Sequence, residues 1–150
     1  MVERDKFFMR AALEEALKTG DEEVPVGAVF VLGEEILSRA HNETIGLCDP
    51  TAHAEIIALR RASLAVKNYR LPQCEVYVTL EPCTMCLGAL IQARIRRLVF
   101  GALDPKAGAV FSILEFPFQK INHRIEVCKG VMEEECSKIL KDFFKKRRKN

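Results

Sequence analysis

The sequence predicts an α/β fold in which helices cover both faces of one sheet. Segments with the apolar spacing of amphipathic helices alternate along the chain with short segments typical of strands. Strand–helix–strand order requires some parallel pairing, because parallel neighbours need a crossover connection. The length of 150 residues, without an internal repeat or linker, predicts one domain over residues 1–150.

Four segments have helical periodicity. In the first, Met9, Leu13 and Leu17 recur every four residues, and Gly20 is a suitable stop. Asp49 is expected to cap the second helix, with Pro50 in its first turn. Pro82 opens the third helix, and the last should bury a stripe formed by Cys136, Ile139, Leu140, Phe143 and Phe144. The predicted helices span 4–18, 49–66, 82–93 and 131–147.

Strands are expected between these helices. A tight turn at 33–35 joins the first two, and Val76, Val78 and Leu80 share one face of the third. Residues 102–121 resist assignment, because two prolines and a glycine interrupt them. The predicted strands span 27–32, 36–41, 74–80, 97–102 and 123–129.

Composition indicates a globular protein of the cell interior. Hydrophobic residues make up 49% of the chain and charged residues 29%, and no stretch approaches the roughly 20 apolar residues that span a membrane. The amphipathic start "MVERDKFFMRAALEEAL" lacks the features of a secretory signal, so we expect a cytoplasmic protein. In a reducing compartment the six cysteines favour metal binding or plain burial over disulfides.

Two short motifs carry the candidate chemistry. "PTAHAEIIAL" places His53 two residues before Glu55, and "LEPCTMCLGAL" places Cys83 three residues before Cys86. Both motifs lie at the opening of a predicted helix, and such openings face the ligand crevice in open α/β sheets. The two sulfurs project from one side of a first turn, where the helix N-terminus favours thiolate. Two thiolates and an imidazole suit Zn²⁺.

The number of ligands favours a catalytic site. Structural zinc sites are closed by four protein ligands, whereas catalytic sites keep one position for water. A fourth ligand from Cys48, Cys74 or His41 would have no convincing spacing. Glu55 is then free to carry protons beside the water. A structural zinc site and a metal-free core in which the cysteines simply pack are the alternatives.

His-x-Glu followed by Pro-Cys-x-x-Cys is the motif of zinc nucleobase deaminases. Beyond it, the chain closely resembles the bacterial tRNA-specific adenosine deaminases over nearly its whole length. The phrases that carry the resemblance are "VPVGAV", "HN", "DPTAHAEI", "NYRL", "YVTLEPCTMC", "VFGALDPKAG", "NHR" and "FFKKRR". Cys48 and the apolar, slightly short stretch at 109–121 depart from the family pattern.

The resemblance implies a three-layer α/β/α, cytidine deaminase-like fold with a central five-stranded mixed sheet, and a cytoplasmic homodimer. It implies hydrolytic conversion of adenosine to inosine at the wobble position of a tRNA anticodon stem-loop, with release of ammonia. One Zn²⁺ per chain would be held by His53, Cys83 and Cys86. Zinc-bound hydroxide would attack C6 of adenine, with Glu55 as the proton shuttle. The matching RNA-contacting positions are Asn42, Asp104, Lys106, Asn122, His123, Phe143, Arg147 and Arg148.

Ordinary structural roles compete with the RNA assignments. Asn42 could end a strand, Asp104 before Pro105 is a common turn start, and the basic end from Lys145 to Lys149 could be solvated. Two rival functions also remain. A zinc deaminase of a free base, nucleoside or nucleotide, of guanine or cytidine type, would share the metal motif. A non-catalytic, zinc-stabilised RNA-binding module would have no use for Glu55.

Overall fold

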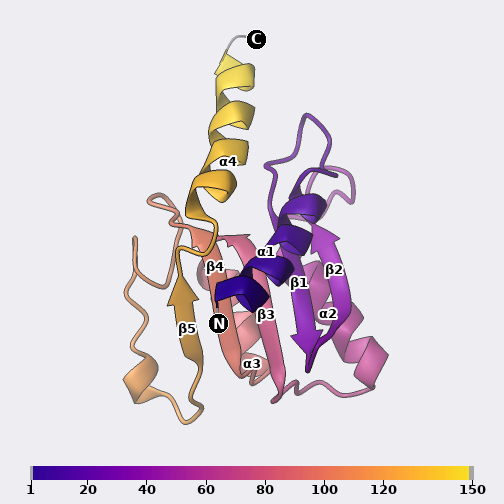
Figure 1. Cartoon of the computed structure of the whole chain (residues 1–150), viewed down its shortest axis with the longest axis vertical. Helices are drawn as coiled ribbons and strands as arrows, with labels where there is room; N and C mark the ends of the chain where they lie inside the picture. The colour runs from indigo at the N-terminus through magenta and orange to yellow at the C-terminus, as the bar shows by residue number, and fades with distance from the viewer. Residues whose placement is uncertain (1, 149–150) are drawn as a thin grey trace.

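The computed structural model describes residues 2–148 and forms three layers, with a mixed sheet between two pairs of helices (Figure 1). The expected three-layer fold with a central five-stranded sheet is confirmed. In chain order the elements are α1 Val2–Ala16, β1 Gly27–Leu32, β2 Glu35–His41, α2 Ala54–Val66, β3 Cys74–Leu80, α3 Thr84–Gln92, β4 Arg97–Ala102, the 3₁₀ helix η1 Phe118–Lys120, β5 Glu126–Lys129 and α4 Glu133–Arg148.

The sheet has the strand order β2-β1-β3-β4-β5. β1 is antiparallel to β2 and to β3, whereas β3–β4 and β4–β5 are parallel. Parallel β3 and β4 end at the same edge, so the segments that follow Leu80 and Ala102 leave the sheet side by side. Each parallel pair needs a crossover, and α3 supplies the one between β3 and β4.

Alternation of side chains along the strands creates one core on each face of the sheet. Val29, Val31, Tyr77 and Val99 face α1 and α4, where they pack with Phe8, Met9 and Cys136. Their neighbours Ala28, Phe30, Val76, Val78 and Leu98 face α2 and α3, where they pack with Ala58, Leu87 and Leu90. The period of two along each strand thus fixes which helices cover which face.

The second and third helices begin later than expected. Asp49 does not cap α2; its carboxylate accepts hydrogen bonds from the backbone N–H and hydroxyl of Thr51, at 2.9 and 2.7 Å, which closes a local turn instead. The N-cap of α2 is His53, and the N-cap of α3 is Cys83 rather than a residue before Pro82. Both helices therefore start directly after a motif residue.

The last helix differs most from the prediction. Of the expected stripe only Cys136 is buried; Ile139, Leu140 and Phe143 are half-buried, and Phe144 is 45% exposed. The first turn of α4 packs against β4, but the helix then continues past the end of the sheet and finds no further layer to pack against (Figure 1). The last strand is also shorter than expected, because residues 123–125 do not join the ladder.

None of the helices within residues 2–148 combines the length and apolar character needed to cross a bilayer.

Candidate active site

The N-termini of α2 and α3 point at the same place, beyond the carboxyl ends of β3 and β4. His53 precedes the first turn of α2 with extended backbone, at φ −75° and ψ 154°, and Cys83 precedes α3 in the same way, at φ −75° and ψ 175°. Cys86 lies in the first turn of α3 and is fully buried. The partial positive ends of two helices therefore meet at this group, which favours sulfur in its thiolate form.

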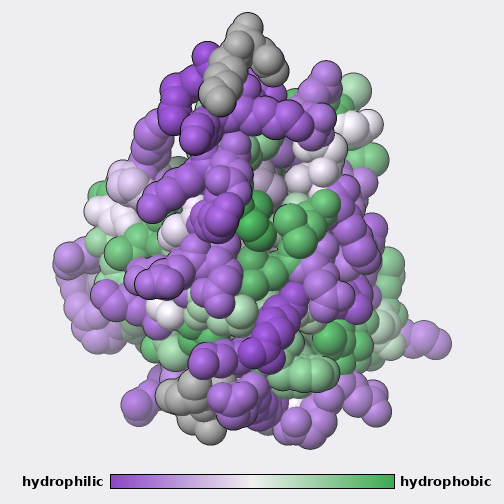
Figure 2. Space-filling view, turned by 45° about the horizontal axis from the view of Figure 1, so that its top comes forward, coloured by the Kyte–Doolittle hydropathy of each residue, from purple (hydrophilic) through white to green (hydrophobic). Residues whose placement is uncertain are grey.

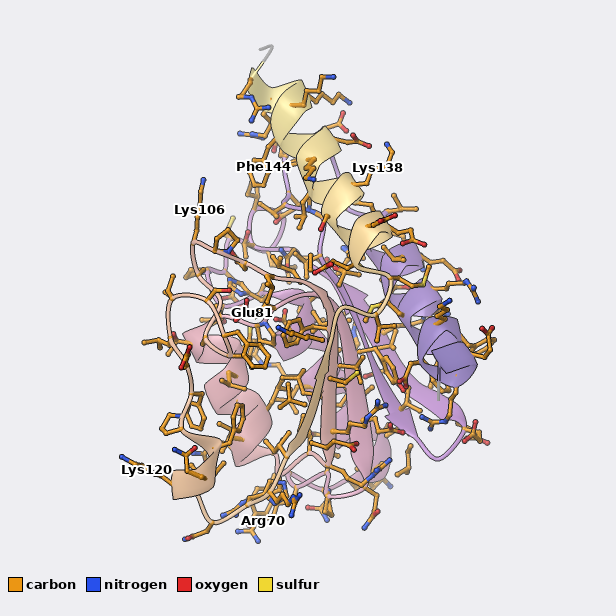
Figure 3. All side chains as sticks on the ribbon, turned by 60° about the vertical axis from the view of Figure 1, so that its left-hand side comes forward. Arg70, Glu81, Lys106, Lys120, Lys138 and Phe144 are labelled. Atoms are coloured by element: carbon orange, nitrogen blue, oxygen red, sulfur yellow. The ribbon has the colours of Figure 1, made fainter. Side chains whose placement is uncertain are left out.

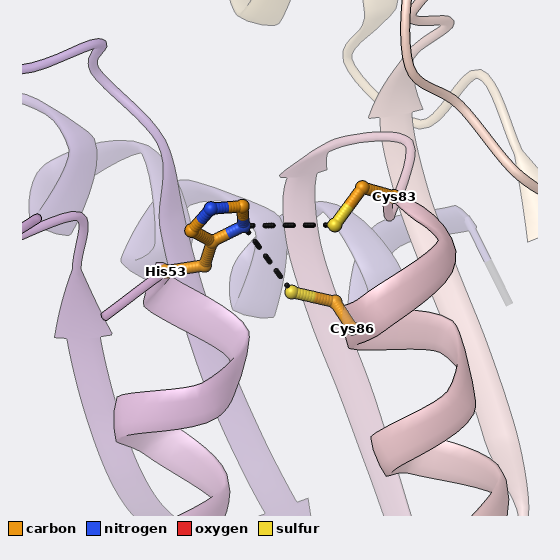
Figure 4. A group of neighbouring side chains, drawn as sticks. All are labelled: His53, Cys83 and Cys86. Carbon is orange, nitrogen blue, oxygen red and sulfur yellow. Dashed lines mark hydrogen bonds between the residues drawn. The ribbon is translucent and has the colours of Figure 1, made fainter. Parts of the chain in front are cut away.

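His53, Cys83 and Cys86 form one compact group of donor atoms (Figure 4). The Nδ1 atom of His53 lies 3.6 Å from the Cys83 sulfur and 3.5 Å from the Cys86 sulfur. A tetrahedral ion with metal–nitrogen and metal–sulfur bonds of about 2.0 and 2.3 Å requires a nitrogen–sulfur separation of about 3.5 Å. The three side chains are thus already spaced to hold one metal ion.

No fourth protein donor belongs to this group among residues 2–148. The donor atoms within 4.8 Å of one another come from His53, Cys83 and Cys86 alone. Cys48 is exposed and Cys74 begins β3 at the other end of the sheet, so neither closes the site. The group has the three-ligand form that leaves a coordination position for water or substrate.

Electrostatics prepares the Cys83 sulfur for a cation, whereas the hydrogen bond to Cys83 and burial raise the pKa of Cys86. Hydrogen bonding from the Cys86 thiol, with a further contribution from His53, lowers the pKa of Cys83 to about 4. The hydrogen bond to Cys83 in turn raises the pKa of His53. At neutral pH the group therefore already carries a thiolate, which is the species that binds metal.

Glu55 lies in the first turn of α2 and is 4% exposed. Burial raises the pKa of its carboxyl to about 7. It lines the same cavity as His53 and Cys83 but is not one of the clustered metal donors. A carboxyl with these properties can take up and release a proton near neutral pH.

A cavity of about 240 Å³ opens beside the donor group. It is lined by Glu23, Val24, Val26, Asn42, Thr44, His53, Glu55, Leu80, Glu81, Cys83, Asp104 and Ala107. The predicted residues Asn42 and Asp104 are therefore brought together with the metal group, from the end of β2 and from the segment after β4. The cavity is small, so it can enclose a single ring system rather than an extended ligand.

Asn42 holds the wall of this cavity together. Its Nδ2 donates to the carbonyl of Val24 at 3.0 Å, and its Oδ1 accepts from the backbone N–H of Ala54 at 2.8 Å. An amide can make further bonds, because one Nδ2 hydrogen and one Oδ1 lone pair remain. Asn42 thus fixes the start of α2 and still presents polar atoms to the cavity.

Glu23 and Glu81 were missed by the sequence analysis although both line the cavity. Burial alone would raise their pKa values, but hydrogen bonds from loop residues hold both pKa values below the ordinary range. For Glu81 a signal existed, because an acid follows the apolar strand "VYVTL" directly before the cysteine motif. Glu23 is one of three acids in "DEE" and carries no such signal.

The remaining predicted residues lie farther out. Lys106 is exposed above the cavity, and its backbone N–H bonds to the Asp104 carboxylate at 3.1 Å (Figure 3). On α4, Phe143 and Arg147 line a separate hollow of about 570 Å³ against the end of α1, and the Arg147 guanidinium lies 5.4 Å from the Phe143 ring centroid. Arg148 is exposed on the same helix.

Asn122 and His123 are not brought to this cavity. They line a hollow of about 290 Å³ with Lys120 at the opposite end of the sheet, the lower end in Figure 3. His123 Nε2 lies 2.6 Å from the carbonyl oxygen of Ile95, just before β4 begins. Within one chain these two residues therefore cannot share a ligand with the metal group.

Comparison with known proteins places this chain in a family. Residues 2–148 match the model of the MafB19-like deaminases. The chain is 52% identical over 149 residues to a tRNA-specific adenosine deaminase of Haemophilus influenzae, which covers 97% of this chain and 86% of the relative. This chain belongs to the tRNA-specific adenosine deaminases. A tRNA-specific adenosine deaminase from Agrobacterium fabrum is 49% identical to this chain, in an alignment that covers 99% of this chain and 98% of the relative.

Solved structures agree with this family membership. A structure from a study of A-to-I editing by tRNA:A34 deaminases at the wobble position of transfer RNA superposes with a TM-score of 0.85. The two sequences are 49% identical, and the superposition covers 89% of this chain and 99% of the chain in that structure. A guanine deaminase from Nitrosomonas europaea, 22% identical, has a TM-score of 0.71 over 93% of this chain and 82% of its own. That likeness shows the shared cytidine deaminase-like fold alone. Members of the family are enzymes, and so is this chain.

Proposed function

We propose that this enzyme binds one zinc ion and hydrolyses the wobble adenosine of a tRNA anticodon to inosine, with release of ammonia. The observation that carries the proposal is the three-donor metal group with a buried, unligated carboxylate beside a cavity of single-base size. The relatives at 49–52% identity are named for tRNA-specific adenosine deamination, which supports the substrate.

Zinc fits this donor set better than the common hard cations. Two sulfurs and one imidazole nitrogen suit a borderline-soft ion, whereas magnesium and calcium prefer oxygen ligands. When bound, zinc lowers the pKa of a coordinated water to about 7 and so supplies a nucleophile at neutral pH. His53, Cys83 and Cys86 would hold the ion, and the pKa of Cys83 near 4 favours its loading at neutral pH.

Glu55 performs the proton transfers in this proposal. It accepts a proton from the attacking water, delivers it to N1 of adenine, and then helps to protonate the amine that leaves C6. The pKa of about 7 allows both the acceptance and the release of that proton. Burial at 4% exposure keeps bulk water from competing for it.

Recognition of the base is assigned to the cavity wall, and recognition of phosphates to the surface around it. Asn42 would offer its remaining amide hydrogen and lone pair to the base. Anticodon loops hold their bases partly unstacked, so moving one adenine into the cavity costs less than in a duplex. Lys106, Arg147 and Arg148 are exposed and would meet phosphates near the mouth, with Phe143 supporting Arg147.

We also propose a cytoplasmic homodimer. Leu64 and Tyr69 at the end of α2 are 78% and 74% exposed, and a hollow of about 740 Å³ lies between the ends of α2 and α3. Apolar exposure of this extent favours contact with another surface. In a dimer, Asn122 and His123 could meet RNA bound at the partner's cavity. Sedimentation of the purified protein gives the oligomeric state directly, and a monomer at all concentrations would refute this part.

One assay separates the proposed function from its rival. Purified enzyme is incubated with an anticodon stem-loop that carries adenosine at the wobble position, and separately with free adenosine, cytidine and guanine. We expect ammonia release and inosine from the stem-loop, with little product from the free compounds. Equal rates on the stem-loop and on free adenosine would contradict the RNA substrate, and guanine as the best substrate would favour the free-base deaminase.

A further inference from the structure

Two loops form the rim of the cavity, and each is tied to a buried carboxylate. We propose that Glu23 and Glu81 are positioning residues for the nucleotide: Glu23 holds the 43–49 loop and Glu81 holds the 103–112 loop, so that the groups that meet substrate stay in place. This inference rests on the proposed function for the identity of the substrate.

Glu23 lies between α1 and β1 and is 8% exposed. Its Oε1 accepts from the backbone N–H of Thr44 at 3.1 Å and from the Thr44 hydroxyl at 2.9 Å. Its Oε2 accepts from the backbone N–H groups of Ile45 at 2.6 Å and Gly46 at 3.2 Å. Three consecutive main-chain donors therefore converge on one carboxylate, so the path of the 43–49 loop depends on it.

Glu81 follows β3 and is 2% exposed. Its Oε1 accepts from the backbone N–H of Asp104 at 3.0 Å and from the Ser112 hydroxyl. Its Oε2 accepts from the backbone N–H groups of Val110, Phe111 and Ser112 at 3.0, 2.7 and 3.2 Å. The carboxylate thus pins both ends of the 103–112 loop to the segment that leads to Cys83 (Figure 3).

Gly108 shows how closely the loop is folded over Glu81. A Cβ atom added at Gly108 would lie 2.3 Å from the Glu81 carboxyl carbon and from its Oε1. A side chain there would displace the carboxylate or the loop. Gly108 also forms a bridge with Cys83, so the loop is attached to the metal-ligand segment at a second point.

The two loops carry the cavity wall that faces the substrate. Thr44 comes from the first loop, and Asp104 and Ala107 from the second. The metal group and Glu55 are held separately, by the first turns of α2 and α3, in which Ile56, Cys86 and Leu87 are buried. Loss of a rim carboxylate should therefore affect substrate binding more than the chemistry of bound substrate.

Hydrogen–deuterium exchange tests the anchoring without any substrate. Glu23→Gln and Glu81→Gln replace an acceptor oxygen with an NH₂ group that faces the N–H donors. We expect the amides of residues 44–46 to exchange faster in Glu23→Gln, and those of residues 104–112 to exchange faster in Glu81→Gln. In each variant, exchange in the loop held by the other glutamate and in α2 and α3 should equal that of the wild type. Gly108→Ala, which keeps the carboxylate but displaces it, should also speed exchange at 104–112.

Steady-state kinetics on the stem-loop tests the consequence for substrate. We expect KM to rise about ten-fold or more in each of the three variants, while kcat changes much less and zinc content stays at one per chain. Glu75→Gln is the matched control. Glu75 is another buried carboxylate, but it lies at the start of β3, away from the cavity, and bonds to Arg4 and Arg97. It should lower thermal stability and leave KM unchanged.

If the amides of both loops exchange in the variants as slowly as in the wild type, Glu23 and Glu81 do not anchor the loops. A loss of kcat or zinc with unchanged KM, or a KM increase of the same size in Glu75→Gln, would overturn the positioning role and leave only a general effect on stability. A wild type that forms no inosine would instead refute the proposed function, and the exchange result would still decide the anchoring.

Discussion

At the scale of single residues, His53 and Glu55 divide two tasks between neighbouring positions of one helix start. His53 points its Nδ1 at the cysteine sulfurs, 3.5 and 3.6 Å away, whereas the Glu55 carboxylate remains outside the donor group. The extended backbone at His53 followed by helical backbone at Glu55 turns the two side chains toward different atoms. This division predicts different losses when either residue is replaced.

Glu55→Gln should abolish most turnover while the metal remains. Glutamine keeps the size and polarity of the side chain but cannot carry the proton, so kcat should fall by about 10²- to 10⁴-fold. Metal analysis and inosine formation are measured on the same preparation. His53→Ala is the contrasting variant and should reduce the metal content itself. Full activity of Glu55→Gln, or absence of metal from the wild type, would refute the division of roles.

The sequence predicts these residues but not the carboxylates of the rim. His53, Glu55, Cys83 and Cys86 belong to two short motifs, so their spacing alone brings their side chains to one helix end each. Glu23 and Glu81 act on amides 21 to 31 residues away, in loops without regular structure. Such partners depend on how loops fold over the end of the sheet, which local periodicity does not encode.

At the scale of elements, α1 packs closely against β1 at Gly27. A Cβ atom added at Gly27 would be 1.9 Å from the Ala12 carbonyl oxygen and 2.6 Å from the Ala16 nitrogen. The contact is with backbone, which cannot rotate away as a side chain can. The absence of a side chain at Gly27 therefore sets the distance between the first helix and the sheet.

Gly27→Ala should destabilise the fold by about 1–3 kcal/mol or more, because overpacking against backbone forces α1 to shift. The free energy of unfolding is measured by urea denaturation. Gly88→Ala in the middle of α3 is the control, since nothing lies within 4 Å of a Cβ there. Alanine favours helix over glycine, so the control should gain about 0.5–1 kcal/mol. A neutral Gly27→Ala would show that α1 adjusts freely.

The sequence predicts which segments form helices and which form strands. It does not predict where some of them begin, or how far α4 is buried. The five strands follow from their apolar patterns, as the match at 74–80 and 97–102 shows. The start of α2 moved to Ala54 because Asp49 and Thr51 form their own turn. On α4 the apolar spacing predicts a buried stripe, but burial also needs a facing layer, and the sheet ends before Phe144 (Figure 3).

At the scale of the whole molecule, a charge network at the end of the sheet opposite the cavity joins α1 to β3 and β4. Arg97 bonds to Asp5 at 2.7 and 2.9 Å and to Glu75 at 3.1 Å, and Tyr77 donates to Asp5 at 2.7 Å. Burial alone would raise the pKa values of Asp5 and Glu75. Hydrogen bonds from Arg97 and Tyr77 hold the pKa of Asp5 below its ordinary value, and hydrogen bonds from Arg4 and Arg97 do the same for Glu75. The carboxylates are therefore ionised in the folded protein.

This network predicts a loss of stability in acid. A carboxyl with a depressed pKa in the folded state stabilises the fold above its unfolded pKa of about 4, and that contribution is lost as pH falls through the folded pKa. The free energy of unfolding should therefore decrease from about pH 5 downward. Asp5→Asn should cost about 3 kcal/mol at pH 7, because it leaves Arg97 underpaired, and should flatten this acid dependence.

Urea denaturation of both proteins from pH 7 to pH 3, at equal metal loading, provides the measurement. The difference between the two curves isolates the network from any loss of metal in acid, since both proteins share the metal group. If the two curves of unfolding free energy against pH remain parallel down to pH 3, protonation of Asp5 does not contribute to the loss of stability in acid. That result would contradict the prediction.

The distribution of charge over the molecule is uneven, although the net charge is only +2. Exposed basic residues gather on the end of α4, which projects from the same end of the sheet as the cavity. Figure 2 shows hydrophilic side chains along this helix. Lys146 pairs with Asp21 at 3.3 Å, whereas Lys145, Arg147 and Arg148 have no ion pair among residues 2–148. The two arginines are, with Lys106, the cations proposed to meet phosphate.

Replacing Arg147 and Arg148 together by alanine should weaken binding of the anticodon stem-loop and flatten its salt dependence. Each lost phosphate contact should reduce the slope of log affinity against log salt by about one unit, so the double variant should lose about two. Lys6→Ala with Arg10→Ala removes the same charge from α1, away from the cavity and from the proposed dimer surface, and should change the slope little. An unchanged slope in the α4 variant would show that the basic end is merely solvated, because screening acts only on charges that meet the RNA.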